Sequence, residues 1–402
     1  MVAIHGAQSA CVAGMSARQW AHRGGKMRFS SFSSIRYTIS EMWNPIKLLQ
    51  QKIFTSALGI DIGTTSIKAV EVTGGDPLPK IINYGFLESS GYLVRTNKVL
   101  QASNLKLFED EAADLLKTLL SEMKPKTNQA YASLPAFAAF MTVLDFPDLA
   151  PKELEKSMAF QAKQYIPLPL SEVAIDWIKV GEFKDDQGYI HQQILLISVP
   201  QETIKKYQKI FKLAGLNLRG LELESLALVR TFGSDPTPTI IVDIGSRSTS
   251  ITFAEKNLLR YVVQSDYGGA SLTQALGASL SINPLRAEEL KKERGIVGTG
   301  PNYELSTIML PFLDVIINEV KKAHYNYGVQ FPKALPIERV VLAGGGSNLL
   351  GIERYVENEM KLPTVKAAPF LQFQSGTALE PLLSELNPLL SVSLGLTLKD
   401  LA

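Results

Sequence analysis

One pattern occurs twice in this chain: an apolar strand runs into Asp-Ile-Gly, and a second apolar strand follows immediately. The first copy occupies residues 57–72 and contains Asp61; the second occupies 239–253 and contains Asp243. Each copy is typical of a β-hairpin with a glycine turn, and a further strand is predicted after each, at 80–87 and 258–264. One such turn arises easily by chance, but two in the same context do not. The repeat predicts a duplicated α/β domain in which each copy presents one turn to a shared cleft.

The segments around the two hairpins predict the domain organisation. Residues 42–130 begin the first domain, and 131–222 form an inserted α+β subdomain with amphipathic helices expected at 151–166 and 202–214. Residues 223–237 return to the first domain and form the linker. The second domain spans 238–373 with its own helical insertion at about 270–335, and 374–402 form a closing segment with a helix expected at 389–398.

The composition excludes several classes of protein. With 402 residues, of which 46% are hydrophobic, the chain is long enough for two or three compact units. A net charge of only +2 gives no reason to expect a nucleic-acid partner. The single cysteine, Cys11, excludes a disulfide framework and a multi-cysteine metal site. No segment is apolar over the ~20 residues that a membrane-spanning helix needs.

The first 41 residues differ from the rest of the chain. They carry five basic residues and one acidic residue, a charge of +4, which leaves −2 on the remaining residues. This Ser- and Arg-rich composition also occurs in transit peptides. We interpret residues 1–41 as a disordered basic tail, or as sequence that precedes a true start at Met42.

The two glycine turns suit phosphate binding. A glycine after the aspartate lets the backbone turn tightly, and the N–H groups of such a turn converge on an anion. Lys68 adds a point charge, whereas Asp61 and Asp243 repel phosphate and need a cation between, for which Mg²⁺ with its retained waters is suited. The turns add hydroxyl donors from Thr64, Thr65, Ser246, Ser248 and Thr249. The alternative is an ordinary hairpin with an Asp-Gly turn, which a single copy would favour.

Two further motifs have less specific patterns. Gly344-Gly345-Gly346-Ser347 lies between a predicted strand and a helix, where glycine allows a ligand to approach the backbone closely; a plain strand-to-helix turn is the alternative. Glu288 and Lys291 share one face of a predicted helix and could bond a ribose and flank a purine, although such a pair alone is more typical of a solvated surface. No G-x-G-x-x-G and no P-loop motif is present.

At these residues the sequence resembles the actin-like ATPase superfamily, and within it most closely the PilM family of type IV pilus assembly. The likeness runs from about Met42 to the C-terminus and includes residues 131–135 (YASLP), 160–170 (FQAKQYIPLPL) and 342–347 (LAGGGS). It implies an actin-like (ribonuclease H-like) fold of duplicated domains with an α+β insert of the kind called 1C in PilM and its cell-division relative FtsA.

The resemblance implies a function as well. PilM-like proteins bind ATP with Mg²⁺ in the interdomain cleft and hold the N-terminal cytoplasmic peptide of the membrane protein PilN beside the insert. It therefore implies a cytoplasmic protein held at the inner membrane through its partner, and leaves open contacts with pilus motor ATPases and self-association. The nucleotide-binding residues it implies are Asp61, Gly63, Thr64, Thr65, Ser66, Lys68, Asp243, Gly245, Ser246, Arg247, Ser248, Thr249, Gly268, Gly269, Glu288, Lys291, Gly344, Gly345, Gly346 and Ser347, with Asp61 and Asp243 holding Mg²⁺ through water. Arg247 departs from the smaller residues common in actin-type second loops.

Hydrolysis of ATP needs a further group that orients or deprotonates water. In the superfamily this group often comes from the helix that leads into the second phosphate loop. That region offers Glu222, Glu224 and Ser225, which we interpret as surface polar residues. The sequence thus predicts ATP binding and identifies no catalytic residue.

Two other functions fit part of the pattern. A sugar-kinase-like phosphotransferase also begins with a D-x-G-T-[TS]-x-x-K hairpin, but no acidic residue of the insert carries a motif that marks a catalytic base. An FtsA-like division filament usually ends in a basic amphipathic membrane helix, whereas residues 394–402 hold one Lys and one Asp.

Overall fold

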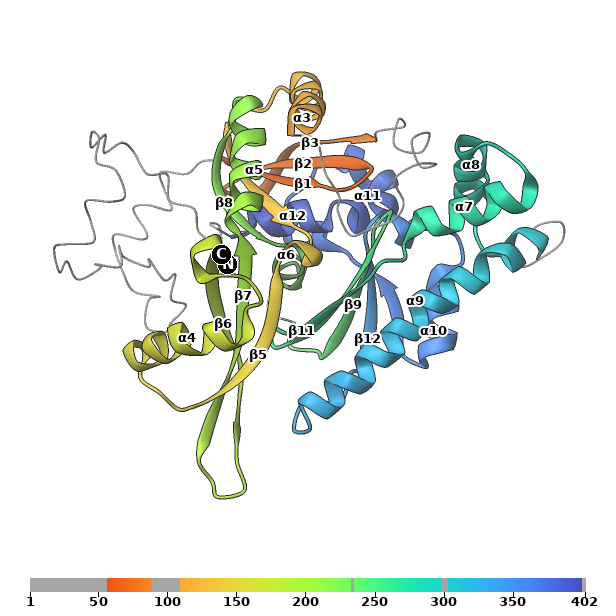
Figure 1. The fold of residues 1–402 in the computed structure, drawn as a ribbon. Helices are drawn as coiled ribbons and strands as arrows, with labels where there is room; N and C mark the ends of the chain where they lie inside the picture. Colours follow the sequence, from red (N-terminus) through yellow and green to blue (C-terminus); the bar gives the residue numbers. More distant parts are fainter. Residues whose placement is uncertain (1–55, 89–108, 233–234, 298–302, 400–402) are drawn as a thin grey trace.

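The computed structural model describes residues 56–88, 109–232, 235–297 and 303–399, which form two lobes and an insert (Figure 1). The predicted tail, residues 1–41, lies outside the described residues. Each lobe contains a five-stranded sheet. The first holds β1 (Ser56–Ile62), β2 (Ser66–Thr73), β3 (Lys80–Glu88), β4 (Gln129–Leu134) and β8 (Asn217–Leu223), in the order β3-β2-β1-β4-β8.

The second sheet repeats the topology of the first. It holds β9 (Thr239–Ile244), β10 (Thr249–Glu255), β11 (Leu258–Ser265), β12 (Arg339–Ala343) and β13 (Thr364–Lys366), in the order β11-β10-β9-β12-β13. In both sheets the three strands of the hairpin unit pair antiparallel, and the two later strands add in parallel on the other side of the first strand. The predicted duplication is therefore confirmed.

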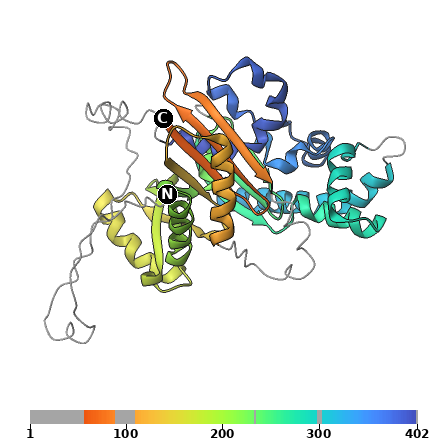
Figure 2. The ribbon, with the colours of Figure 1, turned by 90° about the horizontal axis from the view of Figure 1, so that it is seen from above.

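The central strands are apolar because helices cover both faces of the sheets. In β1, six of seven residues are buried. The helix α3 (Glu109–Met123) lies across one face of the first sheet (Figure 2). Its Ala112, Leu116 and Leu119 are buried in the core. On the other face α12 (Ser391–Thr397), in which every residue is buried, packs against β1, β2 and β4.

A third, three-stranded antiparallel sheet forms the insert. Its strands are β5 (Phe140–Pro147), β6 (Val173–Lys184) and β7 (Ile190–Pro200), in the order β5-β7-β6, and α4 (Pro151–Tyr165) belongs to the same segment. Leu144, Met158, Ala162 and Ile194 join in a separate hydrophobic core for this part. The helix α5 (Gln201–Leu213) begins directly after β7 and packs on α3 and β8, so it connects the insert to the first lobe.

The second lobe carries most of the remaining helices. These are α7 (Gly269–Leu280), α8 (Pro284–Arg294), α9 (Tyr303–Gln330) and α10 (Ile352–Met360). The helix α11 (Leu383–Leu389) belongs to the closing segment, and its Leu386 packs in one cluster with Val70 and Val72 of β2. The long helix α9 packs against α7 and against β10 and β11, and Phe253 stacks on Tyr327 of this helix at a centroid distance of 4.6 Å.

Two short helices lie between the sheets. The helix α6 (Glu224–Arg230) contacts β4 and β8 of the first sheet and β10 and β11 of the second, and α12 packs against it. Ile241 and Val341 of the second sheet belong to the same hydrophobic cluster as β1 and α3, so the core is continuous between the lobes. The first turn of α6 therefore lies where the two glycine turns converge.

The sequence prediction misses part of the closing segment. The single helix expected at 389–398 is instead the end of α11 followed by α12; the two are separated at Leu390, whose φ of −99° and ψ of 7° depart from helical values. The short strand β13 was not predicted, since three residues give no alternating pattern. No helix among the described residues is long and apolar enough to cross a membrane.

Candidate functional site

The two glycine turns have the same backbone geometry. The Gly63 N–H donates to the Ser66 carbonyl at 2.9 Å, and the Gly245 N–H donates to the Ser248 carbonyl at the same distance. The strand register matches as well, because Asp61 lies opposite Lys68 and Asp243 lies opposite Ser250. The two aspartates are thus equivalent positions of the repeated unit.

Both turns line one cavity of about 440 Å³, a size within the range of small-molecule sites. The first lobe and the second lobe both contribute to its wall. Its lining residues are Asp61, Ile62, Gly63, Thr64, Thr65, Ser66, Lys68, Pro135, Phe137, Ala138, Pro200, Glu202, Thr203, Lys206, Tyr207, Ile210, Glu224, Asp243, Gly245, Ser246, Ser248, Ser250, Gln264 and Gly344. The turns that the sequence places 182 residues apart therefore face each other across a shared space.

Asp61 is held by two partners. Its Oδ2 accepts from the Lys68 ammonium at 2.9 Å, and its Oδ1 accepts from the Ser133 hydroxyl at 2.7 Å. Burial acts to lower the pKa of Lys68, but the charge of Asp61 and the hydrogen bond to it outweigh burial, so the pKa is raised above its ordinary value. Lys68 therefore stays protonated, and its charge is directed at the first turn.

Asp243 and Glu224 lie in a more negative environment. Burial, with the charge of Asp61, raises the pKa of Asp243 to about 6. Burial and the charges of Asp61 and Asp243 raise the pKa of Glu224 well above its ordinary value, while Lys68 acts in the opposite direction. The carboxyl groups of Asp61, Asp243 and Glu224 thus lie close together beside Lys68, which is already paired with Asp61, so a cation would lower the electrostatic energy at this part of the cavity.

The donor set of the cavity fits a magnesium ion bound through water. Carboxylates and hydroxyls are the ligands that Mg²⁺ prefers, and it retains several of its waters. Ser250 lies opposite Asp243, is 5% exposed, and its Oγ has no hydrogen-bond partner. Such a buried hydroxyl needs a partner from a ligand or a water shell. Among the described residues no three His, Cys, Asp or Glu are grouped to hold a metal directly.

The helix α7 supports the second turn from behind. The Gly269 N–H donates to the Gly245 carbonyl at 3.0 Å, and the Ala270 N–H donates to the Ser246 carbonyl at 2.7 Å. The Thr249 hydroxyl donates to the Tyr267 carbonyl at 2.8 Å, and Thr249 is fully buried. Three of the predicted nucleotide-binding residues, Gly268, Gly269 and Thr249, thus lie behind the turn and outside the cavity lining. Arg247, in the turn itself, does not line the cavity either.

The Gly344 turn meets the cavity at one residue. Gly344 has a φ of +77°, and a Cβ at this position would lie 2.2 Å from the Asp243 Oδ1, so only glycine fits. Its N–H donates to the Pro388 carbonyl at 2.8 Å, and its carbonyl accepts from the buried Ser347 hydroxyl at 2.6 Å. Gly345, Gly346 and Ser347 follow in a short 3₁₀ helix outside the cavity lining.

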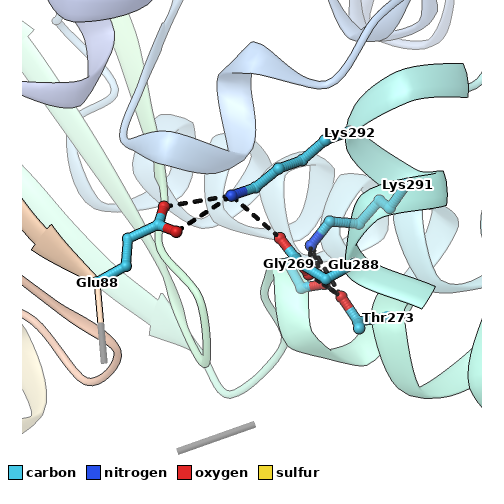
Figure 3. A network of polar contacts seen from close by, with 6 residues as sticks. All are labelled: Glu88, Gly269, Thr273, Glu288, Lys291 and Lys292. Carbon is cyan, nitrogen blue, oxygen red and sulfur yellow. Dashed lines mark hydrogen bonds and ion pairs between the residues drawn. The ribbon is translucent and has the colours of Figure 1, made fainter. Parts of the chain in front are cut away.

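Glu288 and Lys291 lie on α8, one turn apart, and bond to each other at 2.6 Å (Figure 3). The Lys291 ammonium also donates to the Gly269 carbonyl at 3.0 Å and to the Thr273 hydroxyl at 2.9 Å. The pKa of Lys291 is lowered, because the effect of burial outweighs the opposite effect of the Glu288 charge. The pair thus ties α8 to the start of α7, and neither residue lines the cavity. The adjacent Lys292 reaches Glu88 of the first lobe at 3.2 Å.

The interpretation of Glu222, Glu224 and Ser225 as surface polar residues is wrong. Glu222 is 2% exposed and Ser225 is 1% exposed, because α6 lies between the two sheets rather than on the surface. Glu222 accepts two hydrogen bonds from Arg230, at 2.6 and 3.1 Å. Glu224, two residues after Glu222, lines the cavity.

Several cavity residues were not predicted from the sequence. Ser250 lies opposite Asp243 in the second hairpin, so the strand register could have identified it. Ser133 of the YASLP stretch was also missed; it does not line the cavity but bonds to Asp61. Lys206 and Tyr207 come from α5, whose amphipathic pattern carries no sign of a cavity. Gln264 accepts from the Phe137 N–H at 2.8 Å and bridges the second lobe to the segment after β4, a contact that depends on tertiary structure.

Two sheets of equal topology, each presenting one glycine turn to a shared cavity, define an actin-like protein. Solved structures support this class. The PilM-PilN type IV pilus biogenesis complex matches with a TM-score of 0.72 and 23% identity over 86% of this chain and 98% of that one. The ethanolamine utilization protein EutJ from Carboxydothermus hydrogenoformans matches with a TM-score of 0.52 and 18% identity over 85% of this chain and 89% of that one.

The sequence comparisons narrow the class further. Residues 59–401 match the family described as type IV pilus assembly protein PilM, and the chain therefore belongs to that family. The cell division protein FtsA of Enterococcus hirae is a more distant relative, 23% identical over 357 residues, which cover 76% of this chain and 79% of that protein. The resemblance predicted from the sequence, both in fold and in family, is confirmed.

Proposed function

We propose that this protein binds ATP with Mg²⁺ between its two glycine turns and serves in type IV pilus assembly by holding a PilN-type membrane protein. The observation that carries nucleotide binding is the matched pair of turns on one cavity, each with its aspartate at the same register position. The backbone N–H groups of the turns suit a phosphate chain, and Lys68 adds a positive charge.

The cation would be held on the side of the cavity where the two aspartates lie. Asp61 and Asp243 are the residues that would accept from its waters, and Ser250 adds a hydroxyl without another partner. When bound, Mg²⁺ would neutralise phosphate charge. Glu224 lines the cavity beside both aspartates, and we propose it as the carboxyl group that accepts a proton from water.

The partner assignment rests on family membership and on the complex. The solved structure with a TM-score of 0.72 is a complex of PilM with PilN, and it is matched over nearly the whole length of that chain. We propose that the N-terminal cytoplasmic peptide of a PilN-type protein binds beside the insert, within the predicted boundaries 131–222. This protein would then be cytoplasmic and attached to the inner membrane through its partner. Contacts with pilus motor ATPases and self-association stay predictions.

The test of nucleotide binding is titration calorimetry of the full chain with MgATP. Asp243→Asn removes one of the two aspartates with little change of shape, and we expect it to weaken MgATP binding at least tenfold at pH 7.5. Asp186→Asn, an exposed aspartate in the β6–β7 turn, is the matched control and should bind as the wild type does. If Asp243→Asn binds MgATP as tightly as the wild type does, the proposed nucleotide site is contradicted.

The test of the partner is capture of this protein on an immobilised PilN-type N-terminal peptide, with and without MgATP. Capture that a scrambled peptide of the same composition does not reproduce is the expected result. Absence of capture in both conditions would remove the pilus partner from the proposal and leave nucleotide binding intact.

A further inference from the structure

The cavity extends beyond the two turns into the first lobe. Its wall there is formed by the first two turns of α5, which contribute Glu202, Thr203, Lys206 and Tyr207. Nothing in the phosphate-turn motif or in the family resemblance identified this wall. Since α5 starts directly after β7, these side chains are carried by the element that continues from the insert (Figure 1).

The two largest polar side chains of this wall are suited to an anion. The Tyr207 phenol lies near Glu224 and Asp61; burial first and then these two charges raise its pKa above the ordinary value. The phenol is therefore a proton donor at neutral pH. Lys206 lines the same wall and adds a second positive charge to the cavity that Lys68 also lines.

The direction of the phosphate chain follows from the cavity walls. The Gly344 turn and the α8 segment that the sequence predicts for the nucleoside both belong to the second lobe, and only Gly344 reaches the cavity. Because Lys206 and Tyr207 belong to the first lobe, we infer that a phosphate chain held between the turns has its nucleoside end toward the second lobe and its terminal phosphate toward α5. An anionic group at that far end needs donors or a cation, which Lys206 and Tyr207 supply.

We propose that Lys206 and Tyr207 bind the terminal phosphate of the nucleotide and make this site distinguish a nucleoside triphosphate from a diphosphate. The inference rests on the proposed nucleotide binding. It also gives the insert a direct route to the nucleotide: α5 packs on α3 and β8 and is continuous with β7. The presence of the last phosphate is then transmitted to the insert by one helix.

The experiment compares the dissociation constants of Mg²⁺ complexes of a non-hydrolysable ATP analogue and of ADP for the full chain and its variants. In the wild type the analogue binds more tightly than ADP. Lys206→Gln should weaken the analogue about tenfold (about 1.4 kcal/mol) and ADP far less, so the ratio of the two constants falls. Tyr207→Phe, which keeps the ring, should lower the ratio about three- to fivefold.

Matched controls come from the same helix and the same residue types. Lys205→Gln changes the neighbouring exposed lysine of α5, which does not line the cavity, and Tyr325→Phe changes a tyrosine of α9 that is 73% exposed. Both should keep the wild-type ratio. Thermal melting of every variant shows whether it is folded.

The possible results separate the inference from the function it rests on. Wild-type binding with unchanged ratios in Lys206→Gln and Tyr207→Phe overturns the inference and leaves the proposed function in place. Equal weakening of both nucleotides also overturns it, because the residues would then act on a shared part of the ligand. A wild type that binds neither nucleotide overturns both.

Discussion

A buried ion pair beneath the site makes a strong prediction about stability. Glu222 at the end of β8 is 2% exposed and accepts two hydrogen bonds from Arg230 at the end of α6. Arg230 also donates to the Gly395 carbonyl of α12 at 2.7 Å, and Lys399 lies 3.8 Å from Glu222. Removal of the guanidinium leaves a buried carboxylate with one weaker partner.

The expected cost of Arg230→Met follows from these contacts. Breaking a buried pair by removing one partner costs about 3–5 kcal/mol, and the remaining Lys399 keeps the loss near the lower end. The bond to Gly395 adds about 1 kcal/mol. We therefore expect the free energy of unfolding to fall by about 4 kcal/mol, which in a lobe of this size lowers the melting temperature by roughly 10 °C.

The assay is thermal denaturation followed by circular dichroism, with two comparison variants. Arg286→Met breaks an exposed pair with Glu289 and should cost no more than about 0.5 kcal/mol. The double variant Glu222→Gln, Arg230→Met has no buried carboxylate and should regain most of the lost stability. If Arg230→Met melts within about 2 °C of the wild type, or if the double variant is no more stable than the single one, the reasoning is refuted.

Because of the Glu222–Arg230 pair, the difference in stability between the wild type and Arg230→Met should depend on pH. Burial acts to raise the pKa of Glu222, but Arg230 and then Lys399 outweigh burial, so the pKa in the folded wild type is lowered. Its contribution to stability is therefore present at neutral pH and is lost as the pH falls through that lowered value. In Arg230→Met the carboxyl takes up a proton more readily. The gap between the two proteins should narrow as the pH is lowered from 7 to 4.

Three further predictions concern the cavity and the insert. Because the pKa of Asp243 is raised to about 6, the affinity for MgATP should fall between pH 7.5 and 5.5, and calorimetry that shows no such fall would contradict its role toward the cation. Glu224→Gln should bind MgATP several-fold more tightly than the wild type, increasingly so as the pH rises and wild-type Glu224 ionises; weaker binding at every pH would place Glu224 elsewhere. Arg260→Ala should speed hydrogen exchange in residues 173–200, because Arg260 donates to the Val180 carbonyl and fixes the insert to the second lobe; unchanged exchange there would show that other contacts suffice.

The hydrogen bond from Arg260 to the Val180 carbonyl depends on a β-bulge in the insert. The pairing of β6 with β7 shifts between Lys179 and Gly181, and this bulge leaves the Val180 carbonyl to face the guanidinium of Arg260. A Cβ on Gly181 would overlap that guanidinium, so a larger residue here would displace Arg260 from the Val180 carbonyl. Arg260 also lies 5.0 Å from the centre of the Phe331 ring. The insert is thus joined to both lobes, to the first by α5 and to the second by Arg260.

The parts of the fold that could be predicted from the sequence are those whose interactions are between residues close together in the chain. The two hairpins could be predicted because each turn, its flanking strands and its aspartate lie within fifteen or so residues, and their topology and register repeat in the structure. The helix that begins at Pro151 could be predicted because proline at the first helical position marks a start. These features depend on neighbours in the chain.

Other features depend on packing between distant segments and could not be predicted. The burial of Glu222 and Ser225 results from the position of α6 between two sheets, which no pattern in seven residues reveals. Thr249 looks like a phosphate ligand in the sequence, but its hydroxyl donates to Tyr267, 18 residues later. Tyr207 reaches the cavity only because α5 packs beside β8.

The arrangement of the charges connects the site to the rest of the molecule. Asp61 is stabilised by Lys68 and Ser133 of its own lobe, whereas Asp243 has a raised pKa and faces Gly344 and the unpartnered hydroxyl of Ser250. The two equivalent positions therefore differ: the first is electrostatically satisfied within the protein, and the second is not. A cation and a phosphate chain would complete the second position while contacting the first. Since the two positions belong to different lobes, ligand binding is favoured most when the lobes are held together, and this is the physical basis for coupling nucleotide binding to the relative position of the lobes.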